Sequence, residues 1–156
     1  MCAGTAKRLT RLGGTQMAKL QTLDQQRAAF AWDKVSALSG SKVYRDYRSL
    51  ARQLPAMVQT NGLAQTLAFL LTAGEAKKSL YQHLQQWLCG TAPYPVYPTN
   101  ADKEINLMRR LTNGDSLTLR HATLEVQALA LWLKRFAEAL DTEATETTAA
   151  MTGKGG

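Results

Sequence analysis

The apolar positions of this chain recur every three or four residues over most of its length, which is the spacing of one face of an α-helix. The longest such pattern covers Asp115 to Leu140 and contains neither glycine nor proline. Its main row comprises Leu119, Ala122, Val126, Leu129, Leu133, Phe136 and Leu140. A second apolar row lies beside it, formed by Leu117, Leu124, Ala128, Leu131 and Trp132. We predict a central core helix here, and the surplus apolar surface raises the alternative that part of it is a subunit interface.

The same periodicity predicts five shorter helices before this long one. They cover about residues 23–38, 41–54, 55–73, 75–88 and 101–112. Thr22 and Gln25 have the spacing of a capping box at the start of the first helix. Pro55 is expected to open the third helix, where its missing N–H has no cost, and Gly62 inside that helix predicts close packing against a neighbour. No strand and no repeat is evident, so the predicted fold class is all-α, one compact bundle of about six helices with a long central C-terminal helix.

Residues 90–100 interrupt the helical pattern with three prolines. Because proline is excluded from helix interiors, we predict an extended surface loop. Two interpretations are open for the two tyrosines of this loop, Tyr94 and Tyr97. They could stack on single-stranded bases, or they could fold back onto the bundle.

Composition divides the 156-residue chain into three parts. Residues 1–16 form a predicted disordered basic leader, and Met17 is an alternative start of translation. Residues 17–140 form the predicted folded domain, and the Thr-, Ala- and Glu-rich residues 141–156 form a predicted disordered tail. The leader has no apolar run of a secretory signal, and the two distant cysteines predict no disulfide, which together favour a cytoplasmic protein.

The net charge of +7 makes nucleic acid the first partner to consider and an acidic protein surface the second. The charge is concentrated on the helix predicted at residues 41–54, opposite its apolar side. Four cations form a stripe there: Lys42, Arg45, Arg48 and Arg52. Asp46 is the one acid within helical reach of them. Such a stripe could follow a phosphate backbone, although a solvated helix face is the alternative. Three further cations are predicted to help it: Arg27, Lys134 and Arg135.

A search for catalytic chemistry finds little in the sequence. The histidines, His83 and His121, are far apart and have no metal-binding spacing. There is no phosphate-binding glycine loop and no recognisable nucleophile motif. We therefore predict a protein without a metal or another cofactor that binds or assembles rather than catalyses.

Three segments of the sequence resemble a known family. They are residues 22–28 (TLDQQRA) with Trp32, then Leu54-Pro55 with residues 60–70 (TNGLAQTLAFL), then residues 122–129 (ATLEVQAL) with 132–138 (WLKRFAE). In this order they resemble the small α-helical subunit of the Cmr complex, the type III-B CRISPR RNA-guided effector. The leader, the proline-rich loop and the tail lie outside the resemblance.

The resemblance implies a helical subunit that stacks with copies of itself into a minor filament. Its implied partners are the repeating backbone subunit, the large subunit, the guide RNA and the target RNA, with no membrane. In such complexes the RNA-cutting carboxylate belongs to the backbone subunit and nucleotide chemistry to the large subunit. Two alternatives stay open: a free-standing basic helical nucleic-acid-binding protein, and a helical enzyme whose site the sequence does not reveal.

Overall fold

The computed structural model of the protein describes residues 20–99 and 106–152, with side chains to residue 141. Within these residues there are six α-helices, one π-helical turn and no strand, so the all-α prediction is confirmed. The elements are α2 (Leu23–Leu38), α3 (Tyr44–Asn61), α4 (Leu63–Leu70), α5 (Glu75–Gln86), η1 (Trp87–Thr91), α6 (Leu107–Asn113) and α7 (Ser116–Thr152). The predicted leader lies outside the described residues.

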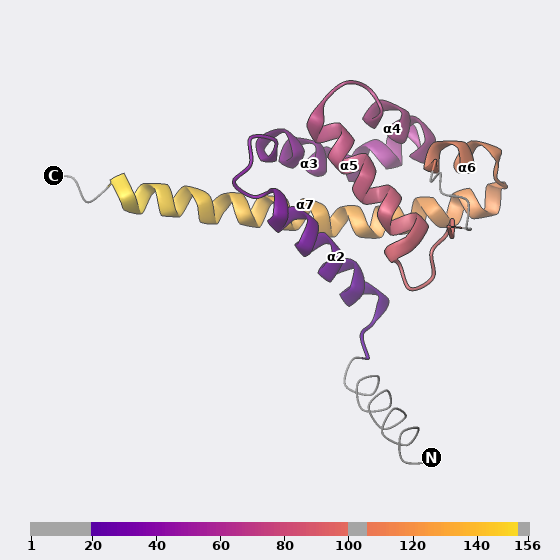
Figure 1. Ribbon diagram of the computed structural model, residues 1–156, viewed down its shortest axis with the longest axis horizontal. Coiled ribbons are helices and arrows are strands. Elements are labelled where there is room, and N and C mark those ends of the chain that lie inside the picture. The colour runs from indigo at the N-terminus through magenta and orange to yellow at the C-terminus, as the bar shows by residue number, and fades with distance from the viewer. Residues whose placement is uncertain (1–19, 100–105, 153–156) are drawn as a thin grey trace, which may run out of the picture.

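Helix α7 is the long central helix that the apolar rows predict. It runs along the whole molecule, α2 crosses it, and α3 lies along its other side (Figure 1). Val126, Leu129 and Leu133 are fully buried in the core that these helices share. In the part of the chain described, no helix is long and apolar enough to span a membrane.

The two ends of α7 differ in how well the sequence predicts them. Asp115 is the N-cap, because its carboxylate accepts a hydrogen bond of 2.8 Å from the backbone N–H of Thr118. The C-terminal end lies beyond the predicted one, because α7 continues past Leu140 to Thr152. The physical reason is the absence of a stop signal, since no glycine or proline occurs after Leu140 until Gly153.

Pro55 does not open a helix, contrary to the prediction. It lies inside α3, which is continuous from Tyr44 to Asn61. The buried positions of α3 explain this continuity, because they keep one spacing of three and four residues across the proline: Tyr44, Tyr47, Ala51, Leu54 and Val58. Burial of this single row offsets the cost of about 3 kcal/mol for a proline inside a helix.

The break between α3 and α4 falls instead at Gly62. Its φ of +81° is a conformation that residues with a Cβ rarely adopt, and its N–H donates to the carbonyl of Val58 at 3.0 Å. Close packing does not explain the glycine, since a Cβ built there would meet nothing within 4 Å. The prediction of a close neighbour was therefore wrong, and backbone conformation is the reason for Gly62.

Two further helix boundaries differ from the prediction. Helix α5 ends at Gln86, and the chain continues in the π-helical turn η1, which is closed by a hydrogen bond from Ala92 N–H to the Trp87 carbonyl. Helix α6 begins at Leu107 rather than at residue 101. Asn106 caps it by accepting a hydrogen bond of 3.1 Å from the backbone N–H of Arg109. Residues 101–105 of the predicted helix lie outside the described residues.

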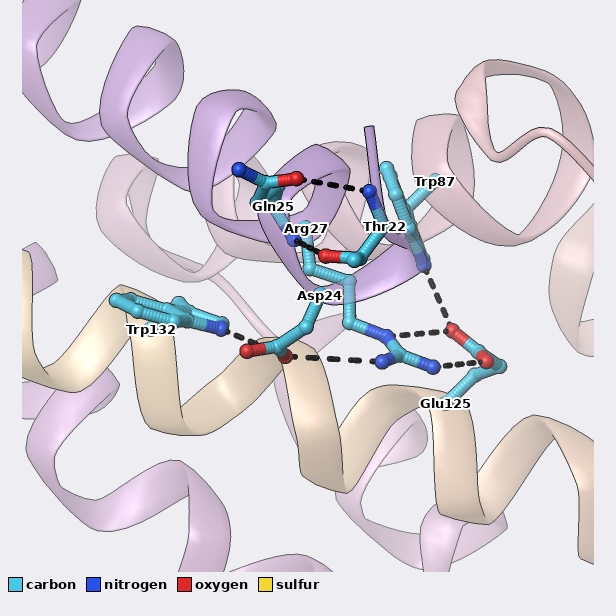
Figure 2. Close-up of polar contacts among 7 residues, drawn as sticks. All are labelled: Thr22, Asp24, Gln25, Arg27, Trp87, Glu125 and Trp132. Carbon is cyan, nitrogen blue, oxygen red and sulfur yellow. Dashed lines mark hydrogen bonds and ion pairs between the residues drawn. The ribbon is translucent and has the colours of Figure 1, made fainter. Parts of the chain in front are cut away.

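A partly buried charged network joins α2, η1 and α7 (Figure 2). The carboxylate of Glu125 accepts two hydrogen bonds from the Arg27 guanidinium, at 2.6 and 3.2 Å, and a third from the Trp87 indole at 3.2 Å. Asp24 lies 3.7 Å from the other side of the guanidinium and accepts a hydrogen bond of 3.0 Å from the Trp132 indole. The side chains of Arg27 and Glu125 are only 15% and 11% exposed. The network therefore fixes α2 across α7.

The ionisation of Glu125 depends on its partners. Burial alone would raise the pKa of its carboxyl, but the hydrogen bonds from Arg27 and Trp87 and the charge of Arg27 outweigh burial and lower it. The hydrogen bond to Glu125 likewise raises the pKa of Arg27. Both groups are therefore charged at neutral pH, and removal of Glu125 leaves Arg27 with only its longer contact to Asp24.

We predict that Glu125→Ala lowers the free energy of unfolding by about 3–5 kcal/mol, because Arg27 is left without its partner. Replacing both groups by apolar residues, in Arg27→Met with Glu125→Leu, should recover much of this loss. Urea unfolding followed by circular dichroism measures both effects.

The matched control is Arg52→Met, which breaks a more exposed ion pair with Glu138 and should cost at most about 1 kcal/mol. A Glu125→Ala protein as stable as that control would contradict a structural role for the network.

Candidate nucleic-acid interface

The predicted basic stripe lies along α3, and the apolar row of the same helix faces the core. Lys42 comes just before the first turn of α3 and is exposed, as is Arg45. Neither forms an ion pair among the residues whose side chains the structure describes. Lys42 also borders a groove of about 430 Å³ between α3 and the turn that precedes α5. These two cations are therefore available to an anionic partner.

The other two cations of the stripe are bound to acids of α7. Arg48 forms an ion pair with Asp141, and Arg52 Nε lies 3.2 Å from a carboxylate oxygen of Glu138. Arg48 is 28% exposed and Arg52 57%. The stripe is therefore divided into an open end at Lys42 and Arg45 and a partly neutralised end along α7.

Two of the predicted helper cations come from α7. Lys134 is half-buried and Arg135 is exposed. Lys134 borders a polar groove of about 350 Å³ between α3 and α7, together with Ser49, Arg52, Gln53 and Glu138. The structure thus brings Lys134 together with the α3 stripe, as the prediction requires.

The structure does not bring Arg27 to this surface. Its guanidinium is held by Glu125 and Asp24 in the network of Figure 2. An RNA contact by Arg27 would require breaking that network, so the structure gives it a part in packing α2 instead. The sequence could not reveal that Arg27 pairs with Glu125, which is 98 residues away on α7.

The proline-rich loop presents its two tyrosines differently. Tyr94 is 82% exposed, whereas Tyr97 is buried. The loop is held to the bundle by a hydrogen bond from Tyr97 N–H to the Leu88 carbonyl (3.0 Å) and by another from Arg110 Nη1 to the Tyr97 carbonyl (2.8 Å). Tyr97 therefore folds back onto the bundle, as the second alternative predicts, whereas Tyr94 is exposed to solvent and its stacking on bases stays a prediction.

His83 is a partly buried partner of a core tyrosine. Its Nδ1 lies 2.8 Å from the hydroxyl of Tyr47, which is fully buried. Burial, and secondarily the charge of Lys34, lowers the pKa of His83 to about 4. Burial likewise raises the pKa of Tyr47. Among the described residues, no group of three His, Cys, Asp or Glu side chains could hold a metal ion.

The arrangement that results is a helical bundle with a cationic surface along α3 and the adjoining part of α7. Comparisons with known proteins identify this class. Residues 23–140 match the family described as CRISPR-associated protein (Cas_Cmr5). The protein "CRISPR system Cmr subunit Cmr5" of Thermus thermophilus is 34% identical over 122 residues, which are 78% of this chain and 97% of the relative.

A solved structure leads to the same family. The crystal structure of a CRISPR-associated Cmr5 family protein from Thermus thermophilus superposes with a TM-score of 0.63 at 32% identity, covering 77% of this chain and 98% of the other. The fold and the sequence together define a small helical subunit of a CRISPR effector. The chain belongs to the Cmr5 family, the small subunits of the type III-B Cmr complex.

The partly buried His83 leads to a prediction on pH. In the unfolded chain His83 takes up a proton near pH 6.5, whereas in the folded chain it does so only near pH 4. Its contribution to stability is therefore full above pH 6.5 and is lost as the pH falls from 6.5 to 4. We expect a fall on the order of 2–3 kcal/mol in the free energy of unfolding over this range.

Urea unfolding at a series of pH values from 7 to 5 isolates the effect of His83 protonation on stability. The carboxyl of Glu125 has a depressed pKa, so its protonation affects stability only at lower pH. His83→Gln should flatten this part of the profile. His121→Gln, at the exposed second histidine, should leave it as in the wild type. An unchanged slope in His83→Gln would show that another group causes the pH dependence.

Proposed function

We propose that this protein is a non-catalytic subunit of a type III-B Cmr ribonucleoprotein in the cytoplasm. In this proposal copies of the subunit stack into a minor filament beside the backbone and large subunits. The filament positions target RNA against the guide RNA in antiviral defence. The observation that carries the RNA-binding part is the open cationic end of α3, where Lys42 and Arg45 have no acidic partner among the described side chains.

The chemistry of that surface supports a contact to phosphates. Lysine and arginine side chains on one helix face can neutralise successive phosphates, and such contacts position a strand without reading its bases. A helper from α7, Arg135, is exposed, and Lys134 borders the groove beside Arg52. The same surface could instead meet an acidic protein, so the assembled complex is the place to test it.

The non-catalytic part of the proposal is supported by the side chains that could have carried chemistry. His83 is hydrogen-bonded to Tyr47, and Glu125 accepts hydrogen bonds from Arg27 and Trp87. Cys89 is buried, and burial raises the pKa of its thiol, which disfavours the reactive thiolate. These groups have structural partners or surroundings, as expected for a subunit that binds.

The stacking part of the proposal is supported by one face of α7. Leu117, Leu124 and Leu131 are seven residues apart and 76%, 58% and 50% exposed. Residues at this spacing lie on one side of a helix, and a row of exposed leucines is typical of a protein-binding surface. We propose that a second copy of the subunit covers this row in the complex.

We predict that Lys42→Glu with Arg45→Glu weakens the binding of target RNA by the assembled complex. The salt slope of the affinity should fall by roughly one unit for each lost phosphate contact. The fold should be preserved, since both side chains are exposed. Titration of complementary target RNA at several salt concentrations measures affinity and slope.

Arg109→Glu is the control, because Arg109 is an exposed cation on α6, at the opposite end of the molecule from the start of α3 (Figure 1). It should change affinity less than the double variant does. Equal affinity and equal slope in wild-type and double-variant complexes would contradict the RNA-binding role. Failure of the double variant to assemble would show that the surface meets protein.

We also predict that Leu124→Glu lowers the number of copies of this subunit in the reconstituted complex, because it places a charge in the centre of the leucine row. Its own stability should change by less than about 0.5 kcal/mol. Native mass spectrometry of the complex counts the copies. Leu71→Glu, with a similar exposure of 54% but outside α7, should assemble normally. Full copy number with Leu124→Glu would contradict stacking through this row.

A further inference from the structure

The polar groove between α3 and α7 carries an inference that rests on the proposed function and makes it more specific. All five of its lining residues are polar or charged: Ser49, Arg52 and Gln53 from α3, and Lys134 and Glu138 from α7. Its volume of about 350 Å³ lies in the range of ligand-binding clefts. A groove whose lining residues are all polar or charged favours a hydrated, charged ligand.

The donors of the groove select the charge of that ligand. Arg52 and Lys134 supply cationic N–H groups, and the Ser49 hydroxyl and the Gln53 amide supply neutral donors. Gln53 Nε2 already lies 3.3 Å from Ser49 Oγ, which holds the two neutral groups side by side. Arginine, lysine, hydroxyl and amide donors together suit the oxygens of a phosphate group.

One group opposes an anion in the groove, and that is Glu138. Its carboxylate lies 3.2 Å from Arg52 Nε, in a pair whose side chains are 57% and 43% exposed. Ion pairs of this exposure contribute little to stability and exchange readily with solvent ions. A phosphate that enters the groove can therefore displace this carboxylate from the Arg52 guanidinium.

The position of the groove favours RNA as the source of the phosphate. Arg45, Ser49 and Arg52 are spaced by four and three residues and so share one face of α3. At 1.5 Å per residue, Arg52 lies about 10 Å along the helix from Arg45, a distance that a few successive phosphates can span. A strand that contacts Lys42 and Arg45 therefore meets the groove next.

We propose that the α3–α7 groove is a binding site for one backbone phosphate of the target RNA, held by Arg52 and Lys134. Before RNA binds, the carboxylate of Glu138 is the anion that pairs with Arg52. The carboxylate therefore sets the affinity of the site, because each binding event must exchange it for phosphate.

Two substitutions of opposite effect test the proposal in the assembled complex with complementary single-stranded target RNA. Lys134→Gln should weaken binding by about tenfold at low salt and lower the salt slope by about 0.7–0.9, as expected for one lost phosphate contact. Glu138→Gln, which keeps the size of the side chain and removes its charge, should strengthen binding by about threefold or more.

A substituted RNA locates the contact. Target RNAs that carry an uncharged methylphosphonate at one linkage at a time should reveal a linkage whose neutralisation weakens wild-type binding. The complex with Lys134→Gln should be insensitive to that same linkage, because the two changes remove one interaction. Arg109→Gln should leave the sensitivity as in the wild type.

The outcomes separate this proposal from the broader one. If Lys42→Glu with Arg45→Glu weakens RNA binding and both groove variants bind as the wild type does, the groove proposal is wrong and the proposed function stands. If none of these variants changes RNA binding, the groove proposal and the RNA-binding part of the proposed function are both wrong. Loss of assembly in Lys134→Gln would mean that the groove binds an acidic protein surface, which overturns the phosphate site.

Discussion

The contact between Arg27 and Glu125 is the constraint on which the arrangement of this bundle depends. A charged pair that is almost removed from water is tolerated only when its geometry is good and its remaining hydrogen-bonding groups are satisfied. Both conditions hold, since Glu125 accepts three hydrogen bonds and Asp24 lies beside the free side of the guanidinium. Leucines at these positions could hold α2 against α7 in several registers. A guanidinium that faces a carboxylate specifies a single register of α2 against α7.

Much of the fold could be predicted from the sequence, because it follows from local rules. The bounds of α2, its capping box at Thr22 and the central place of α7 are consequences of apolar spacing and cap chemistry. The errors at Pro55 and Gly62 have different causes, the first a tertiary contact that outweighs a local preference and the second a backbone conformation. Pro55 stays inside α3 because the buried row continues on both sides of it, and Gly62 serves a left-handed turn that no spacing rule reveals.

The candidate site was predicted in part, for a related reason. A row of cations on α3 is visible in the sequence, and the structure places Lys42, Arg45 and Lys134 on or beside it. The acids that pair with the rest of the row lie on α7, about ninety residues away, beyond any rule of helical spacing. The prediction therefore overstated how much of the stripe is free. A paired cation keeps its charge but must exchange one anion for another in order to bind.

The place of α7 after the other described helices has a consequence for how the protein is made. Arg27 and Glu125 are separated by 98 residues, and the core of α2 and α3 is completed only by α7. At 5–20 residues per second, a ribosome delivers α7 about 5–20 s after α2. During that time the faces of α2 and α3 that pack on α7 have no partner from their own chain. This part of the core can therefore form only after α7 has been synthesised, and chaperones have the preceding interval in which to protect the exposed apolar faces.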